Sequence, residues 1–181
     1  MTKSLAEAVA ASELLFDRAR IEREIDRIAA EIDAGYAAGE RPVYLTIMHG
    51  GLPFAAQLSM AMKTDLEFDY LHASRYRGAT TGAGLAWLHR PATPLRGRKV
   101  LLADDILDEG HTLKAVKQWC EDEGAREVRI AVLAVKQHDR CVEGIAADYV
   151  ALEVPDRYVY GYGMDYHEQG RNLPAIYALG D

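Results

Sequence analysis

The sequence is poor in cysteine and lacks any long apolar run. Its two cysteines, Cys120 and Cys141, form no CxxC pair, which argues against a disulfide framework or a zinc ribbon. No apolar run approaches the length needed to cross a membrane, and Glu7 and Glu13 interrupt the apolar N-terminal stretch, which argues against a signal peptide. We therefore expect a cytoplasmic protein with no membrane partner.

The chain also lacks linker-like tracts of proline, glycine and serine, and it contains no internal repeat. With 181 residues and 49% hydrophobic content, it is long enough to bury one sizeable core. We therefore predict a single domain over residues 1–181.

Acidic residues are missing from residues 70–103, although the chain has a net charge of −7. The charges of this segment come from Arg75, Arg77, Arg90, Arg96, Arg98 and Lys99. A basic run taken alone is usually a solvated loop. A chain with a pI near 5.4 lacks the broad positive footprint of a nucleic-acid-binding protein. We therefore expect this segment to attract a small polyanion rather than nucleic acid.

Strand-like and helix-like segments alternate along the chain. Isoleucines at 21, 25, 28 and 32 mark an amphipathic helix that ends at Gly35 and Gly39. Further helices are expected at 54–62 and 112–123, and strands at 43–48, 66–73, 85–88 (a short return strand), 100–103, 128–135 and 149–154. This alternation predicts an α/β fold with a mainly parallel twisted sheet flanked by helices, and with ligands at the carboxyl ends of the strands.

The most informative stretch is VLLADDILDEGHT, residues 100–112. An apolar strand ends in Asp104 and Asp105, a third carboxylate follows at Asp108, and Gly110 precedes the expected helix. Free N–H groups at a helix N-terminus beside a glycine bind phosphate. Three carboxylates would repel a bare phosphate, so the ligand must also offer hydroxyls, a metal or a basic ring nitrogen. A phosphorylated sugar that reacts at carbon meets this description.

Two other interpretations of this stretch compete with a sugar-phosphate site. A carboxylate pair at a strand end is often only a solvated turn. VLLADD also resembles the acidic strand end of phospho-receiver domains, but there the pair lies near the start of the domain. Here more than half of the chain precedes it, and Glu153 stands where the phospho-accepting aspartate would be expected.

The full run is similar to the phosphoribosyl pyrophosphate signature of type I phosphoribosyltransferases, and the aspartate at 108 is the form seen in their 6-oxopurine, or hypoxanthine-guanine, branch. Further matches follow in the family's order from about residue 43 to 173: Met48-His49-Gly50-Gly51, Ser74-Arg75-Tyr76, Lys136 and the segment 158–171. The resemblance implies transfer of the 5-phosphoribosyl group to N9 of hypoxanthine or guanine, a small hood built from the terminal segments, and a homodimer or homotetramer.

The resemblance also implies a role for each matched residue. The phosphoribosyl group would be bound by Asp104, Asp105, Asp108, Glu109, Gly110, His111 and Thr112, with Asp108 as general acid/base at purine N7. The purine would be bound by Lys136, Tyr158, Val159 and Met164, and the pyrophosphate by His49, Gly50, Arg75 and Arg171. Ser74 and Tyr76 would contribute to loop closure, in which the loop at 75–84 covers the site. Mg²⁺ would take ligands from Asp165, Asp104 and Asp105 and from substrate oxygens.

Two residues depart from the family pattern. Glu109 stands where a small hydroxyl residue is common, and we predict that its side chain points away from the phosphate while its backbone N–H serves the ligand. His49 stands where lysine is frequent, before a glycine, at a peptide bond that can be cis in this family. His49, His111, His138 and His167 show no metal-ligand spacing and are interpreted as non-metal residues.

Several of these assignments also have a purely structural interpretation. Lys136 alone is a charged strand end, Arg171 alone a surface ion-pair partner, and Tyr158, Tyr160 and Tyr162 alternate as they would in a half-buried strand. The alternative function is a regulator that senses phosphoribosyl pyrophosphate or nucleotides with the same fold and binds RNA or a protein.

Overall fold

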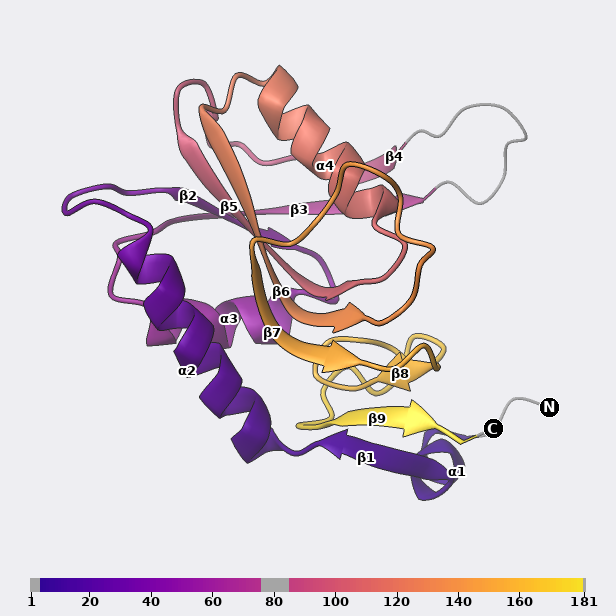
Figure 1. The fold of residues 1–181 in the computed structure, drawn as a ribbon. Coiled ribbons are helices and arrows are strands. Elements are labelled where there is room, and N and C mark those ends of the chain that lie inside the picture. Colours follow the sequence, from indigo (N-terminus) through magenta and orange to yellow (C-terminus); the bar gives the residue numbers. More distant parts are fainter. Residues whose placement is uncertain (1–3, 76–84, 181) are drawn as a thin grey trace.

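The computed structural model describes residues 4–75 and 85–180, which form two sheets and four helices (Figure 1). In chain order the elements are α1 (Leu5–Ala10), β1 (Ser12–Phe16), α2 (Arg18–Ala34), β2 (Val43–Ile47), α3 (Leu52–Ala61), β3 (Glu67–Arg75), β4 (Leu85–His89), β5 (Lys99–Leu107), α4 (His111–Asp122), β6 (Glu127–Lys136), β7 (Tyr149–Val154), β8 (Val159–Tyr160) and β9 (Ile176–Leu179).

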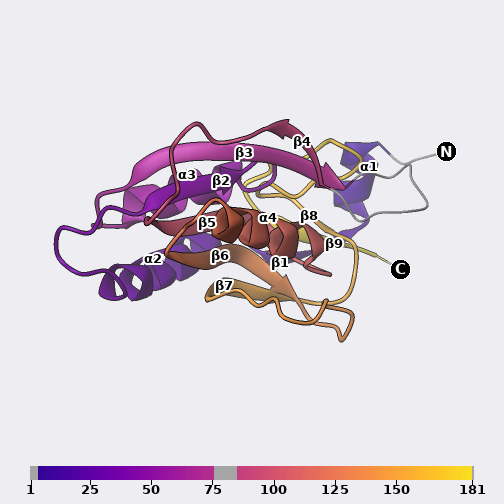
Figure 2. The same ribbon diagram turned by 90° about the horizontal axis from the view of Figure 1, so that it is seen from above.

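The larger sheet has six strands in the order β4-β3-β2-β5-β6-β7. All neighbouring strands run parallel except β4, which returns antiparallel to β3. Seen from above, α4 lies over this sheet, with α2 and α3 on the other side (Figure 2). The mainly parallel sheet flanked by helices and the short return strand are therefore confirmed.

Both faces of the large sheet are buried, which explains the continuous apolar runs of its strands. Side chains alternate across a strand, so Leu101 and Ala103 of β5 pack toward α2 and α3, whereas Val100 and Leu102 pack toward α4. The predicted isoleucine stripe of α2 is fully buried in the first of these two cores. The helix ends at Gly35, as its sequence predicts.

A smaller antiparallel sheet, β1-β9-β8, joins the two ends of the chain. Tyr160 is fully buried in it, and its hydroxyl hydrogen-bonds Ser12 Oγ at 2.9 Å. This sheet is the predicted hood from the terminal segments, and it lies beside the carboxyl ends of β6 and β7 (Figure 1). The alternative interpretation of Tyr158, Tyr160 and Tyr162 as one half-buried strand holds only in part: β8 contains Val159 and Tyr160, because the chain turns at Gly161 with a φ of 96°.

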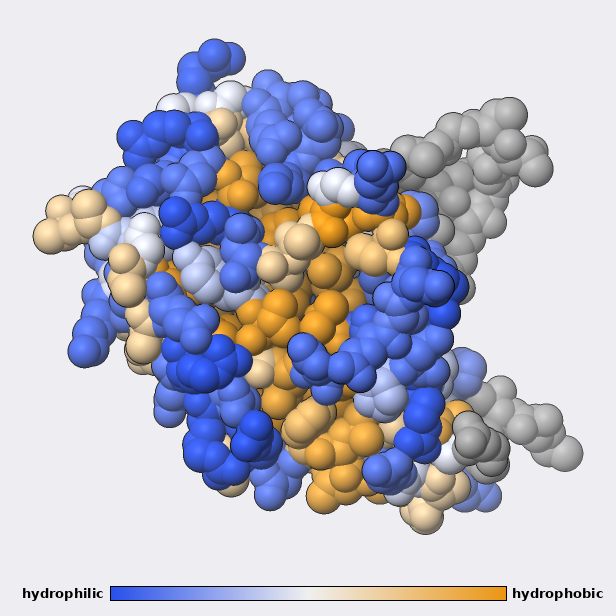
Figure 3. All heavy atoms as spheres, viewed as in Figure 1, coloured by the Kyte–Doolittle hydropathy of each residue, from blue (hydrophilic) through white to orange (hydrophobic). Residues whose placement is uncertain are grey.

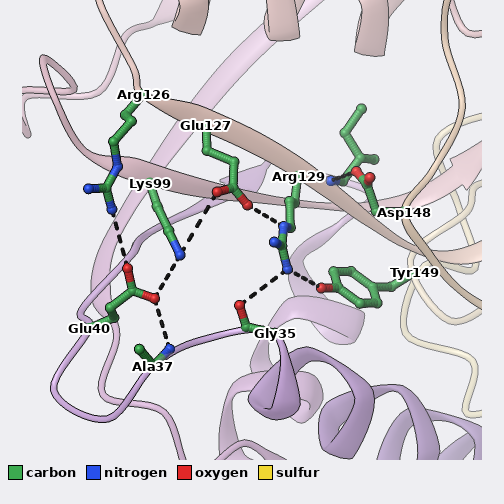
Figure 4. A network of polar contacts seen from close by, with 10 residues as sticks. Gly35, Ala37, Glu40, Lys99, Arg126, Glu127, Arg129, Asp148 and Tyr149 are labelled. Carbon is green, nitrogen blue, oxygen red and sulfur yellow. Dashed lines mark hydrogen bonds and ion pairs between the residues drawn. The ribbon is translucent and has the colours of Figure 1, made fainter.

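A polar network lies at the end of the large sheet where its parallel strands begin (Figure 4). Lys99 Nζ donates to Glu40 Oε2 at 2.7 Å, and Arg126 pairs with the other oxygen of Glu40 at 3.2 Å. Arg129 donates to the hydroxyl of Tyr149 at 2.7 Å. These bonds tie β5, β6 and β7 to the chain that leads into β2.

The prediction that residues 70–103 attract a small polyanion is wrong for Arg98 and Lys99. Arg98 pairs with Glu67 at 2.8 Å, and Lys99 pairs with Glu40. Acidic residues from other parts of the chain thus neutralise them, at the edge of the sheet away from the strands' carboxyl ends. Arg90 instead lies over the ring of Trp87, 5.0 Å from its centroid.

Hydrophilic residues cover most of the face shown in Figure 3, with an apolar band down its middle between α2 and α4. Within residues 4–75 and 85–180, no helix has both the length and the apolar character to cross a membrane.

Candidate active site

A cavity of about 390 Å³ opens where β2, β3 and β5 end. In an open parallel sheet the carboxyl ends of the strands gather the loops that bind ligands. Ten residues predicted for the site line this cavity: His49, Gly50, Asp104, Asp105, Asp108, Glu109, Gly110, His111, Thr112 and Arg171. They come from segments far apart in the sequence, so the tertiary fold brings the predicted site together.

The acidic turn is shorter than the sequence predicts. Strand β5 continues to Leu107 rather than ending at Ala103, because β6 keeps pairing with it through Asp104↔Val132 and Leu107↔Val135. The prediction of a loop directly after Ala103 is therefore wrong, and the acidic pair lies within the strand. Only residues 108–110 form the turn into α4.

Gly110 makes this tight turn possible. Its φ is +81°, and a Cβ there would lie 2.7 Å from Ile145 Cγ2, so a larger residue would be strained and would force Ile145 to move. The intrahelical ladder of α4 starts with Lys114 N–H donating to the Gly110 carbonyl at 2.9 Å. The N-cap residue Gly110 has no side chain to cap the helix, and residues 110–113 line the cavity, so the N-terminus of α4 faces it.

Asp104 and Asp105 form a coupled carboxylate pair. Asp104 is only 8% exposed and accepts a hydrogen bond from the backbone N–H of Asp105 at 3.0 Å. Burial raises the pKa of Asp104 well above its usual value, and the charge of Asp105 raises it further. Burial also raises the pKa of Asp105, although Arg171 opposes this effect. Two adjacent carboxyl groups, one buried and one half-buried, favour a ligand that donates hydrogen bonds or carries positive charge.

Asp108 lies in a different environment, with two donors at its carboxylate. Lys136 Nζ lies 2.7 Å from Oδ2, and His138 Nε2 lies 2.6 Å from Oδ1. Partial burial works to raise the pKa of Asp108, but the hydrogen bonds from Lys136 and His138 outweigh it and lower the pKa. Asp108 is therefore ionised at neutral pH while its side chain stays 41% exposed.

The loop after β2 packs directly against the acidic pair. A Cβ on Gly50 would collide with the carboxylate of Asp105, so only glycine brings the backbone this close. The Met48–His49 peptide bond is cis, as the resemblance allowed. The ring of His49 meets His72 with centroids 4.4 Å apart. Partial burial lowers the pKa of His72, and the nearby His49 and Arg171 lower it further.

Arg171 brings the C-terminal segment to the cavity. Its Nη1 donates to the carbonyl of Gly163 at 2.7 Å, and its Nη2 pairs with Asp165 Oδ1 at 2.9 Å. The other oxygen of Asp165 accepts the N–H of Glu168 at 2.8 Å. A guanidinium held by two fixed acceptors is well placed to bind an anion in the cavity.

Comparison with known proteins identifies the family. The sequence matches the phosphoribosyl transferase domain over residues 12–167. The chain belongs to this family. A hypoxanthine-guanine phosphoribosyltransferase from Streptococcus pneumoniae strain R6 is 38% identical over 154 residues, which cover 84% of each chain. One from Lactococcus lactis is 39% identical over 142 residues, covering 78% of this chain and 76% of that protein.

Comparison with a solved structure supports the same family fold. The crystal structure of a hypoxanthine phosphoribosyltransferase from Staphylococcus aureus is similar with a TM-score of 0.88 and 27% identity, covering 98% of this chain and 97% of that chain. The resemblance expected from residues 100–112 and the predicted fold class are therefore confirmed.

Within this family fold, five predicted residues do not line the cavity: Lys136, Tyr158, Val159, Met164 and Asp165. Lys136 lies next to the cavity because it is bonded to Asp108, which does line it. Val159 and Met164 have side chains buried in the core under the hood, which leaves only their backbone for a ligand. Tyr158 is 44% exposed on the hood, and its hydroxyl donates to the Asp165 carbonyl at 3.1 Å.

The predicted closing loop cannot be placed in the same way. Tyr76 and the side chains of Ser74 and Arg75 lie outside the described residues, so their roles stay predictions.

Glu109, in the predicted phosphate loop, lines the cavity, and its carboxylate lies near His111 in the first turn of α4. Glu109 Oε2 lies 3.7 Å from Nε2 of His111, and its side chain is 43% exposed. Its backbone carbonyl accepts the N–H of Val142 at 2.9 Å. The prediction that only its backbone N–H serves the phosphate stays a prediction.

Two site residues escaped the sequence reasoning, His72 and His138. His72 stands on β3 two residues before the predicted phosphate-contacting loop, so its place at a strand's carboxyl end was a usable signal. His138 gave no such signal, because 30 positions separate it from Asp108 and only the pairing of β5 with β6 brings the two together.

Proposed function

We propose that this protein transfers the 5-phosphoribosyl group from phosphoribosyl pyrophosphate to N9 of hypoxanthine or guanine, releasing pyrophosphate and a nucleoside monophosphate. One observation carries the proposal: a single cavity holds a buried acid pair, a glycine-led helix N-terminus and an ionised Asp108. This combination binds a phosphorylated sugar and still leaves one carboxylate for a base.

The sugar phosphate is bound by two kinds of group. The first N–H groups of α4, after Gly110, accept the 5′-phosphate, because they and the helix dipole favour an anion. Asp104 and Asp105 accept hydrogen bonds from the ribose 2′ and 3′ hydroxyls, which removes part of the unfavourable burial of two carboxyl groups.

The purine is bound at Asp108. Purine N7 would take the place of one donor on the Asp108 carboxylate, while Lys136 turns from Asp108 to the 6-oxo group of the base. An ammonium donates to an oxo group but not to an amino group, so Lys136 selects 6-oxopurines over 6-aminopurines. Tyr158 supplies an aromatic face for the ring.

Pyrophosphate leaves toward His49, Gly50 and Arg171, with Arg75 of the closing loop as the fourth predicted ligand. Mg²⁺ belongs to this proposal, because the buried pair of Asp104 and Asp105 presents the oxygen ligands that it prefers. Among residues 4–75 and 85–180, no three His, Cys, Asp or Glu side chains lie together to hold a metal alone. Substrate oxygens and Asp165 would complete the coordination, and the bound ion would neutralise charge on the leaving group.

A spectrophotometric assay tests the proposal. Purified protein, Mg²⁺ and phosphoribosyl pyrophosphate are mixed with hypoxanthine, guanine, xanthine or adenine, and turnover is expected with at least one 6-oxopurine and not with adenine. Turnover should be lost on adding EDTA and recovered with excess Mg²⁺. Binding of phosphoribosyl pyrophosphate without turnover on any base would overturn the proposal and favour a regulator.

The oligomeric state and the location belong to the same proposal. We propose a homodimer or homotetramer acting in the cytoplasm, as the family resemblance implies. Light scattering at assay concentration and fractionation of cells that produce the protein check these two points, and a monomer would contradict the first.

A further inference from the structure

His138 is the second hydrogen-bond partner of Asp108, and its ring is almost completely enclosed. The side chain is 2% exposed, and Nε2 lies 2.6 Å from Asp108 Oδ1. The other ring nitrogen, Nδ1, accepts the backbone N–H of Arg140 at 3.0 Å. A neutral imidazole carries one N–H, so an accepting Nδ1 places the proton on Nε2. His138 therefore donates to Asp108.

The turn that carries His138 is itself held at both ends. The N–H of Gln137 donates to the carbonyl of Val154 at 2.9 Å. The guanidinium of Arg140 makes two bonds of 2.7 Å to the carboxylate of Asp156, a bidentate pairing with fixed geometry. His138 is thus a rigid donor, whereas Lys136 is a long, flexible side chain that can move to another acceptor.

We propose that His138 is a positioning residue that fixes Oδ1 of Asp108, so that Oδ2 stays aimed at purine N7 once Lys136 has turned to the base. The inference rests on the proposed function. Rotation about the last bond of an aspartate has a broad, soft profile, so an unheld carboxylate would turn freely. Holding a reacting group in its productive orientation lowers the barrier without adding a new chemical step.

The test compares His138→Phe, which fills the space without a donor, with His138→Gln, whose amide N–H can replace Nε2–H. We expect kcat of His138→Phe to fall about tenfold, the effect of losing one hydrogen bond to a charged group. KM for phosphoribosyl pyrophosphate should stay within about twofold, because the sugar-phosphate contacts are untouched. His138→Gln should recover most of the lost kcat.

His89→Phe serves as a matched control. His89 stacks on Tyr70 with centroids 4.1 Å apart and does not line the cavity, so its replacement should leave kcat unchanged. Thermal unfolding of both phenylalanine variants shows whether either fold is damaged. Equal losses in the Phe and Gln variants, or a rise in KM with kcat unchanged, would overturn the positioning role.

A second measurement needs neither substrate nor turnover. Imidazole ¹⁵N NMR of histidine-labelled protein at about pH 8 should show the His138 proton on Nε2, and a proton on Nδ1 would overturn the inference. Failure of the wild-type protein to turn over any 6-oxopurine would contradict the proposed function. Normal wild-type turnover with a fully active His138→Phe would contradict only the role of His138.

Discussion

At the scale of single residues, Asp104 near the end of β5 and Asp108 just after it have opposite electrostatic environments. Burial and mutual repulsion raise the pKa of Asp104, whereas Lys136 and His138 lower the pKa of Asp108. Such a separation assigns different roles to neighbouring carboxyl groups. Asp108 is the group that stays charged at neutral pH and can take or share a proton at the base, while Asp104 is suited to hydroxyl or metal contacts.

Replacing Asp108 tests its role as general acid/base. Asp108→Asn keeps the shape of the side chain but removes its charge and basicity. Turnover should fall about 100-fold or more, the usual contribution of general acid–base catalysis. The dissociation constant for phosphoribosyl pyrophosphate, measured by calorimetry, should change far less. A loss of binding as large as the loss of turnover would contradict the assignment.

Neutralising Asp104 should stabilise the ligand-free protein. A carboxyl whose folded pKa is raised costs stability at every pH above its unfolded pKa, near 3.8, and protonation relieves that cost. We expect Asp104→Asn to raise stability at pH 7 by about 1 kcal/mol, which for a chain of this size raises Tm by about 2–4 °C. Binding of phosphoribosyl pyrophosphate should weaken in the same variant. Calorimetry measures both, and a lower Tm would contradict the assigned burial cost.

Glu109 adds a negative charge to the phosphate loop. If only its backbone N–H serves the phosphate, Glu109→Ser should leave the affinity for phosphoribosyl pyrophosphate within about threefold, since a solvent-screened charge contributes little. The measurement is the dissociation constant at low and at high salt. A greatly improved affinity in the serine variant would show that the carboxylate repels the phosphate.

At the scale of elements, the strands were easier to predict than their ends. The apolar runs of β5 and β6 identify both strands, because a strand buried on two faces needs apolar side chains on both. Their lengths depend on each other, since β5 extends past Ala103 only where β6 continues to pair with it. The strands of the hood are too short to give a pattern, and β1 and β9 pair although they come from opposite ends of the chain.

Asp33 links α2 to the segment between α3 and β3. It accepts the N–H groups of Lys63 and Thr64 at 2.9 Å each and the Thr64 hydroxyl at 2.7 Å. Burial works to raise the pKa of Asp33, but these bonds outweigh it and lower the pKa. A lowered carboxyl pKa contributes stability that is present above the unfolded pKa, near 3.8, and is lost as the pH falls through the folded value.

We therefore expect Asp33→Ala to destabilise the protein by about 1–2 kcal/mol at pH 7. Asp26→Ala, at an exposed position of the same helix, should change stability by less than about 0.5 kcal/mol. Urea unfolding measures both, and the gap between the two variants should narrow at about pH 3. A gap that is unchanged in acid would show that the charge of Asp33 is not the cause.

At the scale of the whole molecule, the hood and the large sheet share one core. Ile176 and Ala178 of the hood belong to the same buried cluster as Tyr44 and Leu101 of the large sheet. A continuous core couples the two parts, so we expect one cooperative unfolding transition. Fluorescence of Trp87 on β4 and Trp119 on α4, whose ring centroids lie 4.9 Å apart, should follow the same transition as the tyrosine signals of the hood. Two separate transitions would contradict the single-domain prediction.

The sequence by itself determined the alternation of strands and helices and the strand–turn–helix of residues 100–112. These are local properties, set by side-chain period and by the backbone freedom of one glycine. The tertiary structure decided which charges meet. His138 reaches Asp108 only across the β5–β6 pair, and Arg98 and Lys99 pair with acidic residues at the end of the sheet where the parallel strands begin. Asp104 is buried more deeply than Asp108. The electrostatic interactions of a side chain depend on the groups that lie near it in space, whereas a sequence pattern describes only the groups that lie near it along the chain.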